Sequence, residues 1–149
     1  MSKKELKVAL NIEATALCHA TENREKVKTA ILNIVPEELR QEAEKWMSVL
    51  MLEGYYGNPI SVIRLTVDKA EMASKLLMHI IKKLDHEDFT KLSFTFHDRL
   101  DSSGNLYIRL DKQSAFHGKL KLYEGDDVIK VRVKLTRQFL NEIIEKGLK

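Results

Sequence analysis

The sequence is poor in the residues from which disulfides, metal centres and membrane spans are built. Cys18 is the single cysteine, so no disulfide can form within the chain, and a reducing compartment is favoured. The N-terminus has lysines but no uninterrupted apolar run or cleavage pattern, and no segment approaches the roughly 18 apolar residues that a membrane span needs. These absences predict a cytoplasmic protein with no membrane partner.

Sequence motifs for catalysis and cofactor binding are also missing. There is no Cys-x-x-Cys or His-x-x-x-His pair, and the neighbouring Cys18 and His19 would face opposite ways in a strand. No phosphate-binding loop, dinucleotide fingerprint or nucleophile elbow is present. Most carboxylates lie beside lysines on predicted helix faces, as ordinary solvated charge does. The sequence therefore predicts a non-enzymatic protein without a metal or cofactor.

Length and composition predict one folded domain. The 149 residues are 44% hydrophobic and 32% charged, which is typical of a globular protein with a hydrophobic core and a well-charged surface. No repeat, linker or low-complexity tract divides the chain, so residues 1–149 are expected to form a single domain.

The first third of the chain predicts a strand and then a helix. Apolar and polar residues alternate over residues 6–18, which indicates a half-buried strand. Its inward residues are Leu6, Val8, Leu10 and Ile12. A helix capped by Thr21 or Asn23 follows and stops at Pro36. Its apolar stripe consists of Val27, Ala30, Ile31 and Ile34. Residues 37–45 are polar and fit either a short helical turn or a loop.

The middle of the chain predicts two strands and a long helix. Residues 46–53 and 60–67 read as strands around a turn at residues 54–59. The inward positions of the second strand are Ile60, Val62 and Leu65. Asp68 is the expected cap of the helix. Its buried stripe consists of Ala70, Ala73, Leu76, Leu77, Ile80, Ile81 and Leu84.

Residues 86–98 fit two patterns. Phe89, Leu92 and Phe96 have helical spacing, whereas Leu92, Phe94 and Phe96 alternate as in a strand. We favour a helix capped by Asp85 and ended by a turn at residues 102–104. A last helix is expected at residues 137–148. The mixed order of elements predicts an α+β fold: a single two-layer domain with a mostly antiparallel or mixed sheet and helices packed on one face.

Residues 105–135 carry the functional signal, because they read as three short strands with one apolar face. The opposite face would be basic and carry two tyrosines: Tyr107, Arg109, Lys119, Lys121, Tyr123, Lys130, Arg132 and Lys134. Basic side chains two positions apart lie about 6.6 Å apart along a strand, comparable to successive phosphates. Between residues 105 and 137, eight basic residues outnumber four acidic ones. This pattern predicts binding of RNA, with the tyrosines stacking on unpaired bases.

Other interpretations of the same residues remain open. Lysines on exposed strands also protect sheet edges from aggregation. In the loop at residues 111–118, Lys112 and Gln113 are candidate contacts to a phosphate and a base edge, while Ala115 and Phe116 fit a purely structural connection. Tyr55–Tyr56 in the glycine-rich turn is a second, weaker stacking candidate, and a packed hairpin turn is the favoured explanation of these two residues.

Four sequence blocks resemble an archaeal family of small RNA-binding proteins predicted to be associated with the exosome. They are residues 19–22 (HATE), Asn33 with Pro36, residues 53–60 (EGYYGNPI), and residues 109–113 (RLDKQ) with Ala115 and Gly118. The resemblance spans nearly the whole chain and implies RNA binding and an α+β fold like that of the ribosomal protein that contacts five-S RNA. Two positions depart from it: Asn23, where an acidic residue is expected, and residues 93–96, which are poor in helix formers.

The sequence thus predicts a non-enzymatic RNA-binding protein, an accessory factor of the archaeal exosome or of RNA processing. RNA, single-stranded or structured, and exosome subunits are the expected partners. The competing interpretation is a protein-interaction module without direct RNA contact, including a homodimer formed by strand pairing at an open sheet edge.

Overall fold

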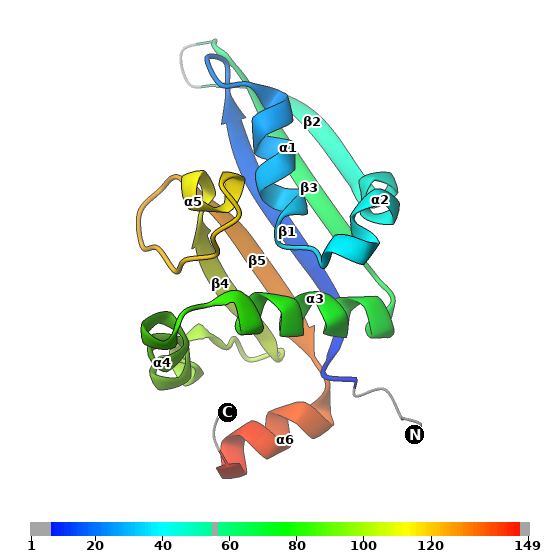
Figure 1. The fold of residues 1–149 in the computed structure, drawn as a ribbon, viewed down its shortest axis with the longest axis vertical. Helices are drawn as coiled ribbons and strands as arrows, with labels where there is room; N and C mark the ends of the chain where they lie inside the picture. Colours follow the sequence, from blue (N-terminus) through cyan, green and yellow to red (C-terminus); the bar gives the residue numbers. More distant parts are fainter. Residues whose placement is uncertain (1–6, 55–56, 147–149) are drawn as a thin grey trace.

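The computed structural model of the protein describes residues 7–54 and 57–146 and contains one five-stranded antiparallel sheet (Figure 1). The strand order is β2-β3-β1-β5-β4. The strands are β1 (Ala9–His19), β2 (Met47–Glu53), β3 (Pro59–Val67), β4 (Asn105–Asp111) and β5 (Val128–Leu135). The expected α+β architecture is confirmed, with every strand pair antiparallel.

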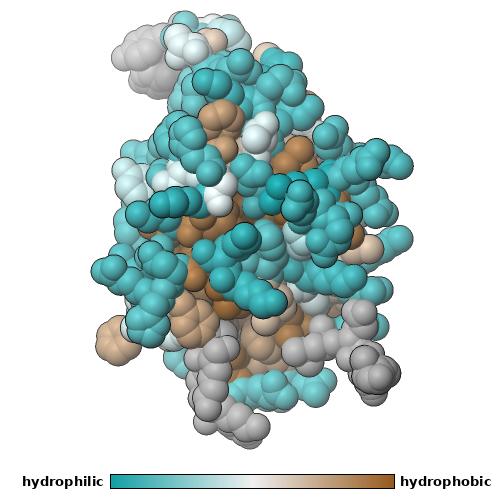
Figure 2. All heavy atoms as spheres, in the orientation of Figure 1, coloured by the Kyte–Doolittle hydropathy of each residue, from teal (hydrophilic) through white to brown (hydrophobic). Residues whose placement is uncertain are grey.

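Helices form the second layer on one face of the sheet, except for the C-terminal helix, which lies beyond the end of the strands (Figure 1). The helices are α1 (Arg24–Leu32), α2 (Arg40–Ala43), α3 (Ala70–Lys83), α4 (His86–Phe94), α5 (Lys112–Phe116) and α6 (Arg137–Lys146). Three single turns of 3-10 helix lie at Glu37–Leu39, Glu44–Trp46 and His97–Arg99. Figure 2 shows this side with hydrophilic side chains over most of it and hydrophobic atoms visible between them.

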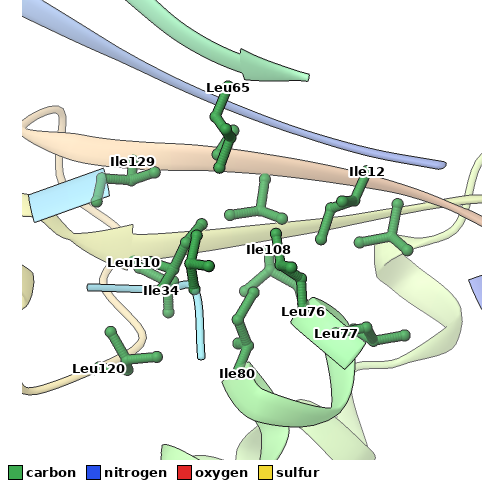
Figure 3. Close-up of a cluster of buried hydrophobic side chains, with 14 of the residues drawn as sticks. Ile12, Ile34, Leu65, Leu76, Leu77, Ile80, Ile108, Leu110, Leu120 and Ile129 are labelled. Atoms are coloured by element: carbon green, nitrogen blue, oxygen red, sulfur yellow. The ribbon is translucent and has the colours of Figure 1, made fainter. Parts of the chain in front are cut away.

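The hydrophobic core lies between α3 and the central strands. Leu76, Leu77 and Ile80 of α3 are fully buried, and Leu76 and Ile80 point toward Ile108 of β4 (Figure 3). Each such side chain contributes about 1.5–3 kcal/mol when it leaves water. The predicted stripe of α3 is therefore confirmed as the main contact between the layers.

A register shift early in β1 changes one predicted facing. The pairing of β1 with β5 slips between Ala9 and Asn11, which leaves Leu10 45% exposed while Val8 and Ala9 are buried. Simple alternation had placed Leu10 inward, and that prediction is wrong because the extra residue of a bulge inverts the alternation. Ser74 of α3 compensates the irregularity: its buried hydroxyl accepts hydrogen bonds from the Val8 and Ala9 amides, both at 3.0 Å.

The facing of β3 also differs from the prediction. Ile63, Leu65 and Val67 belong to the core, so Ile60 and Val62 lie on the opposite face of the sheet and only Leu65 was placed correctly. Four of residues 60–65 are apolar, so either the even-numbered or the odd-numbered residues could face the core. The register of β3 with β1 decides which set does.

The region of three predicted strands contains two. Residues 119–123 form an isolated bridge, Leu110 to Leu122, along the outer edge of β4. Leu120 and Leu122 are buried as expected. The predicted loop at residues 111–118 contains the short helix α5, whose cap Asp111 accepts a hydrogen bond from the Ser114 amide.

Helix boundaries follow the available caps. Asn23 caps α1 and Asp85 caps α4, which decides the ambiguous residues 86–98 in favour of a helix. That helix ends at Phe94, well before the turn that was expected to stop it. Lys69, not Asp68, occupies the N-cap of α3, where no side chain makes the capping hydrogen bond. Of the other predicted positions, Leu6, Tyr55, Tyr56 and residues 147–148 of the last predicted helix lie outside the described residues.

Substitution Ser74→Ala is expected to lower the free energy of unfolding by about 1–3 kcal/mol, because two buried amide groups lose their acceptor. Urea denaturation followed by circular dichroism measures the change. Lys75→Ala, an exposed neighbour on the same helix, is the control and is expected to change stability by less than about 0.5 kcal/mol. Equal midpoints for both variants would contradict the role of Ser74.

Candidate nucleic-acid interface

The sheet surface opposite the helices, called here the open face, carries most of the predicted contact residues. Strand register fixes its pattern, because directly paired residues share a face. Tyr107 of β4 lies opposite Arg132 of β5, and Arg109 lies opposite Lys130. Lys134 pairs with Asn105 at the end of the same ladder. These five residues, Tyr107, Arg109, Lys130, Arg132 and Lys134, form what we call the basic strip.

Several basic side chains of the strip are held in place by the protein itself. Arg109 donates a 2.5 Å hydrogen bond from Nη2 to the Gly125 carbonyl, and Lys134 donates to the Ser103 carbonyl. Arg132 donates from Nη1 to the side-chain oxygens of Asn11 and Asn105. Lys130 is exposed. The strip thus combines positioned guanidinium groups with an exposed ammonium group.

One carboxylate lies among these cations. Glu13 of β1 is 3.4 Å from Nε of Arg64 and 3.8 Å from Nε of Arg132. Sequence reasoning missed Arg64 as a member of the open face because it assigned the wrong parity to β3. Strand pairing identifies Arg64 as part of the open face. Thr15 of β1 pairs with Arg64 on one side and with Lys130 on the other, so the three residues form one row on the same face.

The segment after α5 extends the basic surface beyond β4. The Asp111 amide donates to the Lys121 carbonyl, and the Tyr123 amide donates to the Arg109 carbonyl. Since Leu122 is buried, alternation places its neighbours Lys121 and Tyr123 toward the open face. Lys119, Lys121 and Tyr123 are exposed, and Tyr123 keeps 45% of its surface accessible.

Tyr107 is oriented by a hydrogen bond at its hydroxyl. It donates to Asp101 at 3.0 Å, and this bond raises the pKa of the tyrosine. The Asp101 carboxylate also accepts from the Asn105 amide and side chain, which together with the tyrosine lower its pKa to about 2. Tyr107 as a whole is 45% exposed, while its hydroxyl group is held by Asp101.

Lys112 directly follows the end of β4, and its side chain is buried instead of exposed on the open face. Its ammonium group donates to the Leu17 carbonyl at 2.8 Å and lies 2.9 Å from Glu22 and 2.8 Å from Asp127. An ammonium group has three donors, and these partners use all three. Burial acts to lower the pKa of Lys112, but the hydrogen bonds and charges of Asp127 and Glu22 outweigh it, and the pKa is raised. The same contacts lower the pKa of Asp127.

Gln113 lies beside this buried lysine rather than on the open face. Its side-chain amide donates to Asp127 at 2.9 Å. It borders a hollow of about 440 Å³ between α1 and α5, whose lining includes Lys26 and Phe116. The predicted contact residues therefore separate into two places: Lys112 and Gln113 at α5, and the remaining eight on or beside the open face.

The described residues give no sign of a metal centre or membrane span. Within residues 7–54 and 57–146, no group of three or more histidine, cysteine, aspartate or glutamate residues is arranged to hold a metal ion. None of the helices described there is long and apolar enough to cross a membrane.

Comparison with known proteins gives a family and two relatives. A family model described as RNA binding matches residues 11–135. The chain is similar to the RNA-binding protein PAB1135 of Pyrococcus abyssi, with 38% identity over 127 residues, covering 85% of this chain and 82% of that protein. It is similar to the uncharacterized protein MJ0213 of Methanocaldococcus jannaschii, with 37% identity over 122 residues and 80% of each chain covered.

Solved structures of archaeal proteins share the fold. Mth689 from Methanothermobacter thermautotrophicus is 29% identical, with a TM-score of 0.72 and coverage of 93% of this chain and 97% of that one. SSO0741 from Sulfolobus solfataricus is 25% identical, with a TM-score of 0.74 and coverage of 91% and 95%.

Substitution Lys112→Met is expected to lower the free energy of unfolding by about 2–3 kcal/mol near neutral pH. The variant keeps most of the aliphatic chain but leaves Glu22 and Asp127 without their cation, and their partial exposure moderates the loss. Chemical denaturation measures it, with the exposed Lys130→Met as control.

The stability difference between wild type and Lys112→Met should depend on pH in a defined way. The depressed pKa of Asp127 gives a contribution present above its unfolded value of 3.8 and lost as pH falls through the folded value. The raised pKa of Lys112 gives a contribution present below 10.5 and lost above the folded value. The difference should be largest between these limits and shrink in acid. A difference independent of pH would contradict the ionic origin.

Proposed function

The chain belongs to this RNA-binding family, and on that premise we propose that it binds RNA through the basic strip on its open face. The carrying observation is the register between β4 and β5, which sets Tyr107 opposite Arg132 and Arg109 opposite Lys130. Basic side chains that repeat along a strand can contact successive phosphates of an RNA backbone. Hydrogen bonds within the protein already hold Arg109 and Arg132, so less side-chain entropy is lost when RNA binds.

Stacking on exposed tyrosines supplies the second part of the proposed mode. Tyr107 and Tyr123 are each 45% exposed and stand beside Arg132 and Arg109 respectively. Aromatic rings between phosphate-binding cations hold unpaired bases without reading their sequence. Single-stranded RNA is therefore the preferred ligand in this proposal, with Lys119 and Lys121 extending the path along β4.

The α5 residues take different roles in the proposal. Lys112 has no free donor for a phosphate, so we assign it to holding β1, α5 and the segment before β5 together. Gln113 lies on the rim of the hollow beside α1 and stays a candidate contact for a nucleotide there. We propose that the protein acts in the cytoplasm and has no catalytic activity of its own. Two further points stay predictions from the family resemblance. They are the exosome subunits as partners and the likeness to the ribosomal protein that contacts five-S RNA.

Removal of three strip cations tests the RNA surface. The variant Lys130→Ala, Arg132→Ala, Lys134→Ala should bind labelled single-stranded RNA more weakly. The slope of log affinity against log salt should fall by roughly 2, because up to three phosphate contacts at about 0.7 each are lost. Fluorescence anisotropy over a salt series measures both quantities.

A charge-matched variant is the control for this test. Lys75→Ala, Lys82→Ala, Lys83→Ala removes the same charge from exposed positions of α3, in the helical layer. Its binding should change little. Equal loss in the two variants would reduce the interaction to net charge, and an unchanged slope in the strip variant would remove the strip from the interface.

Tyr123 tests stacking separately from charge. Tyr123→Ala should weaken binding of single-stranded RNA by about 1–3 kcal/mol, whereas Tyr123→Phe, which keeps the ring, should bind nearly as wild type. Duplex RNA should be insensitive to both. If Tyr123→Ala weakens duplex and single-stranded binding equally, the ring acts through the fold or the backbone and the stacking role fails.

A further inference from the structure

The two edge strands of the sheet, β4 and β2, differ in whether other backbone segments pair with their outer sides. The outer edge of β4 is occupied by the protein's own backbone, through hydrogen bonds to residues 101, 121 and 123 and a bridge from Leu100 to Leu106. At the other edge lies β2, whose hydrogen bonds run to β3 alone. Within the part of the chain that the structure describes, no backbone pairs with the outer side of β2.

The free strand β2 lacks the devices that normally protect an edge. Its sequence is Met-Ser-Val-Leu-Met-Leu-Glu, with no lysine, proline or bulge. Val49, Leu50, Met51 and Leu52 are 41%, 52%, 53% and 47% exposed. A long, flat, apolar edge of this kind is a template for pairing with another strand.

The apolar surface continues from β2 onto the open face. Leu50 pairs with Val62, which pairs with Leu17, so the three form one row across the sheet. Leu52 and Ile60 occupy the next row. We call these five residues, Leu17, Leu50, Leu52, Ile60 and Val62, the apolar patch. The apolar patch contains no aromatic ring for stacking. It lies on the open face, toward the β2 edge of the sheet and away from the β4 edge.

We propose that the protein forms a homodimer in which β2 pairs antiparallel with β2 of a second copy, around a two-fold axis at Leu50. This register places Leu50 opposite Leu50, Val49 opposite Met51 and Ser48 opposite Leu52. All seven strand residues then find partners. The two sheets become one sheet of ten strands, and the two apolar patches meet on the same side of it.

The second copy fits this edge for three reasons. An apolar strand is complementary to itself in the antiparallel sense, so an isologous contact leaves no charge unmatched along residues 47–52. Glu53 would approach the start of the partner strand, where Lys45 precedes it. Because other backbone segments already pair with the β4 edge, β2 is the one free edge among the described residues, and pairing closes at two copies instead of growing into a filament.

The mass of the protein in solution tests the proposal. Light scattering on the wild-type chain across a concentration series should give twice the 17.2 kDa of one chain. Leu50→Lys brings two ammonium groups together at the axis and should give the monomer mass. The control Phe94→Lys replaces an 89% exposed side chain on α4 and should stay dimeric.

A crosslinking experiment reports the register without disturbing the fold. Leu50→Cys places two thiols on directly paired residues, within the reach of a disulfide, so mild oxidation should give a covalent dimer. Met78→Cys, at a position on α3 that is 40% exposed, should not crosslink, and the buried Cys18 is not available. A monomeric wild type, or a Leu50→Lys variant that stays dimeric, would overturn the proposal. Binding of short RNA per chain is expected to be unchanged in Leu50→Lys, so the two proposals fail independently.

Discussion

The antiparallel pairing of β1 with both β3 and β5 is the constraint on which the rest of the structure depends. Its register decides which side chain of each neighbouring strand faces the helices and which faces outward. Through β5 it also sets the facing of β4, so Ile12 and Ile108 meet α3 while Arg132 and Tyr107 share the open face. A slip of one residue at β1 would exchange core and surface along the whole sheet.

Local patterns predicted the elements well and their facing less well. The stripe of α3, the caps Asn23 and Asp85, and the basic alternation of β5 depend on residues close in the sequence, and the structure contains them as expected. The sequence placed Leu10 and Val62 on the wrong face of the sheet. A bulge breaks the alternation at Leu10, and the apolar run around Val62 fits either face until the partner strand is known. The partners of Lys112 were invisible for the same reason: Glu22 is 90 positions away.

The predicted contact residues show how one residue type serves two purposes. Lys130 and Lys112 look alike in a sequence rich in lysine, yet one is exposed on a strand and the other is 3% exposed between two carboxylates. A buried ammonium group needs such partners, because an unpaired charge in the interior costs several kcal/mol. The carboxylates that satisfy it come from the turn between β1 and α1 and from the segment before β5, so this cation connects distant parts of the chain.

The place of β5 at the far end of the sequence bears on how the protein is made. β1 ends at His19, but its second neighbour, β5, begins only at Val128. The pairing of the central strand with β5 must therefore wait until residues 128–135 have been synthesised. During that interval β1 can pair only with β3, so one side of the central strand stays exposed until β5 is available.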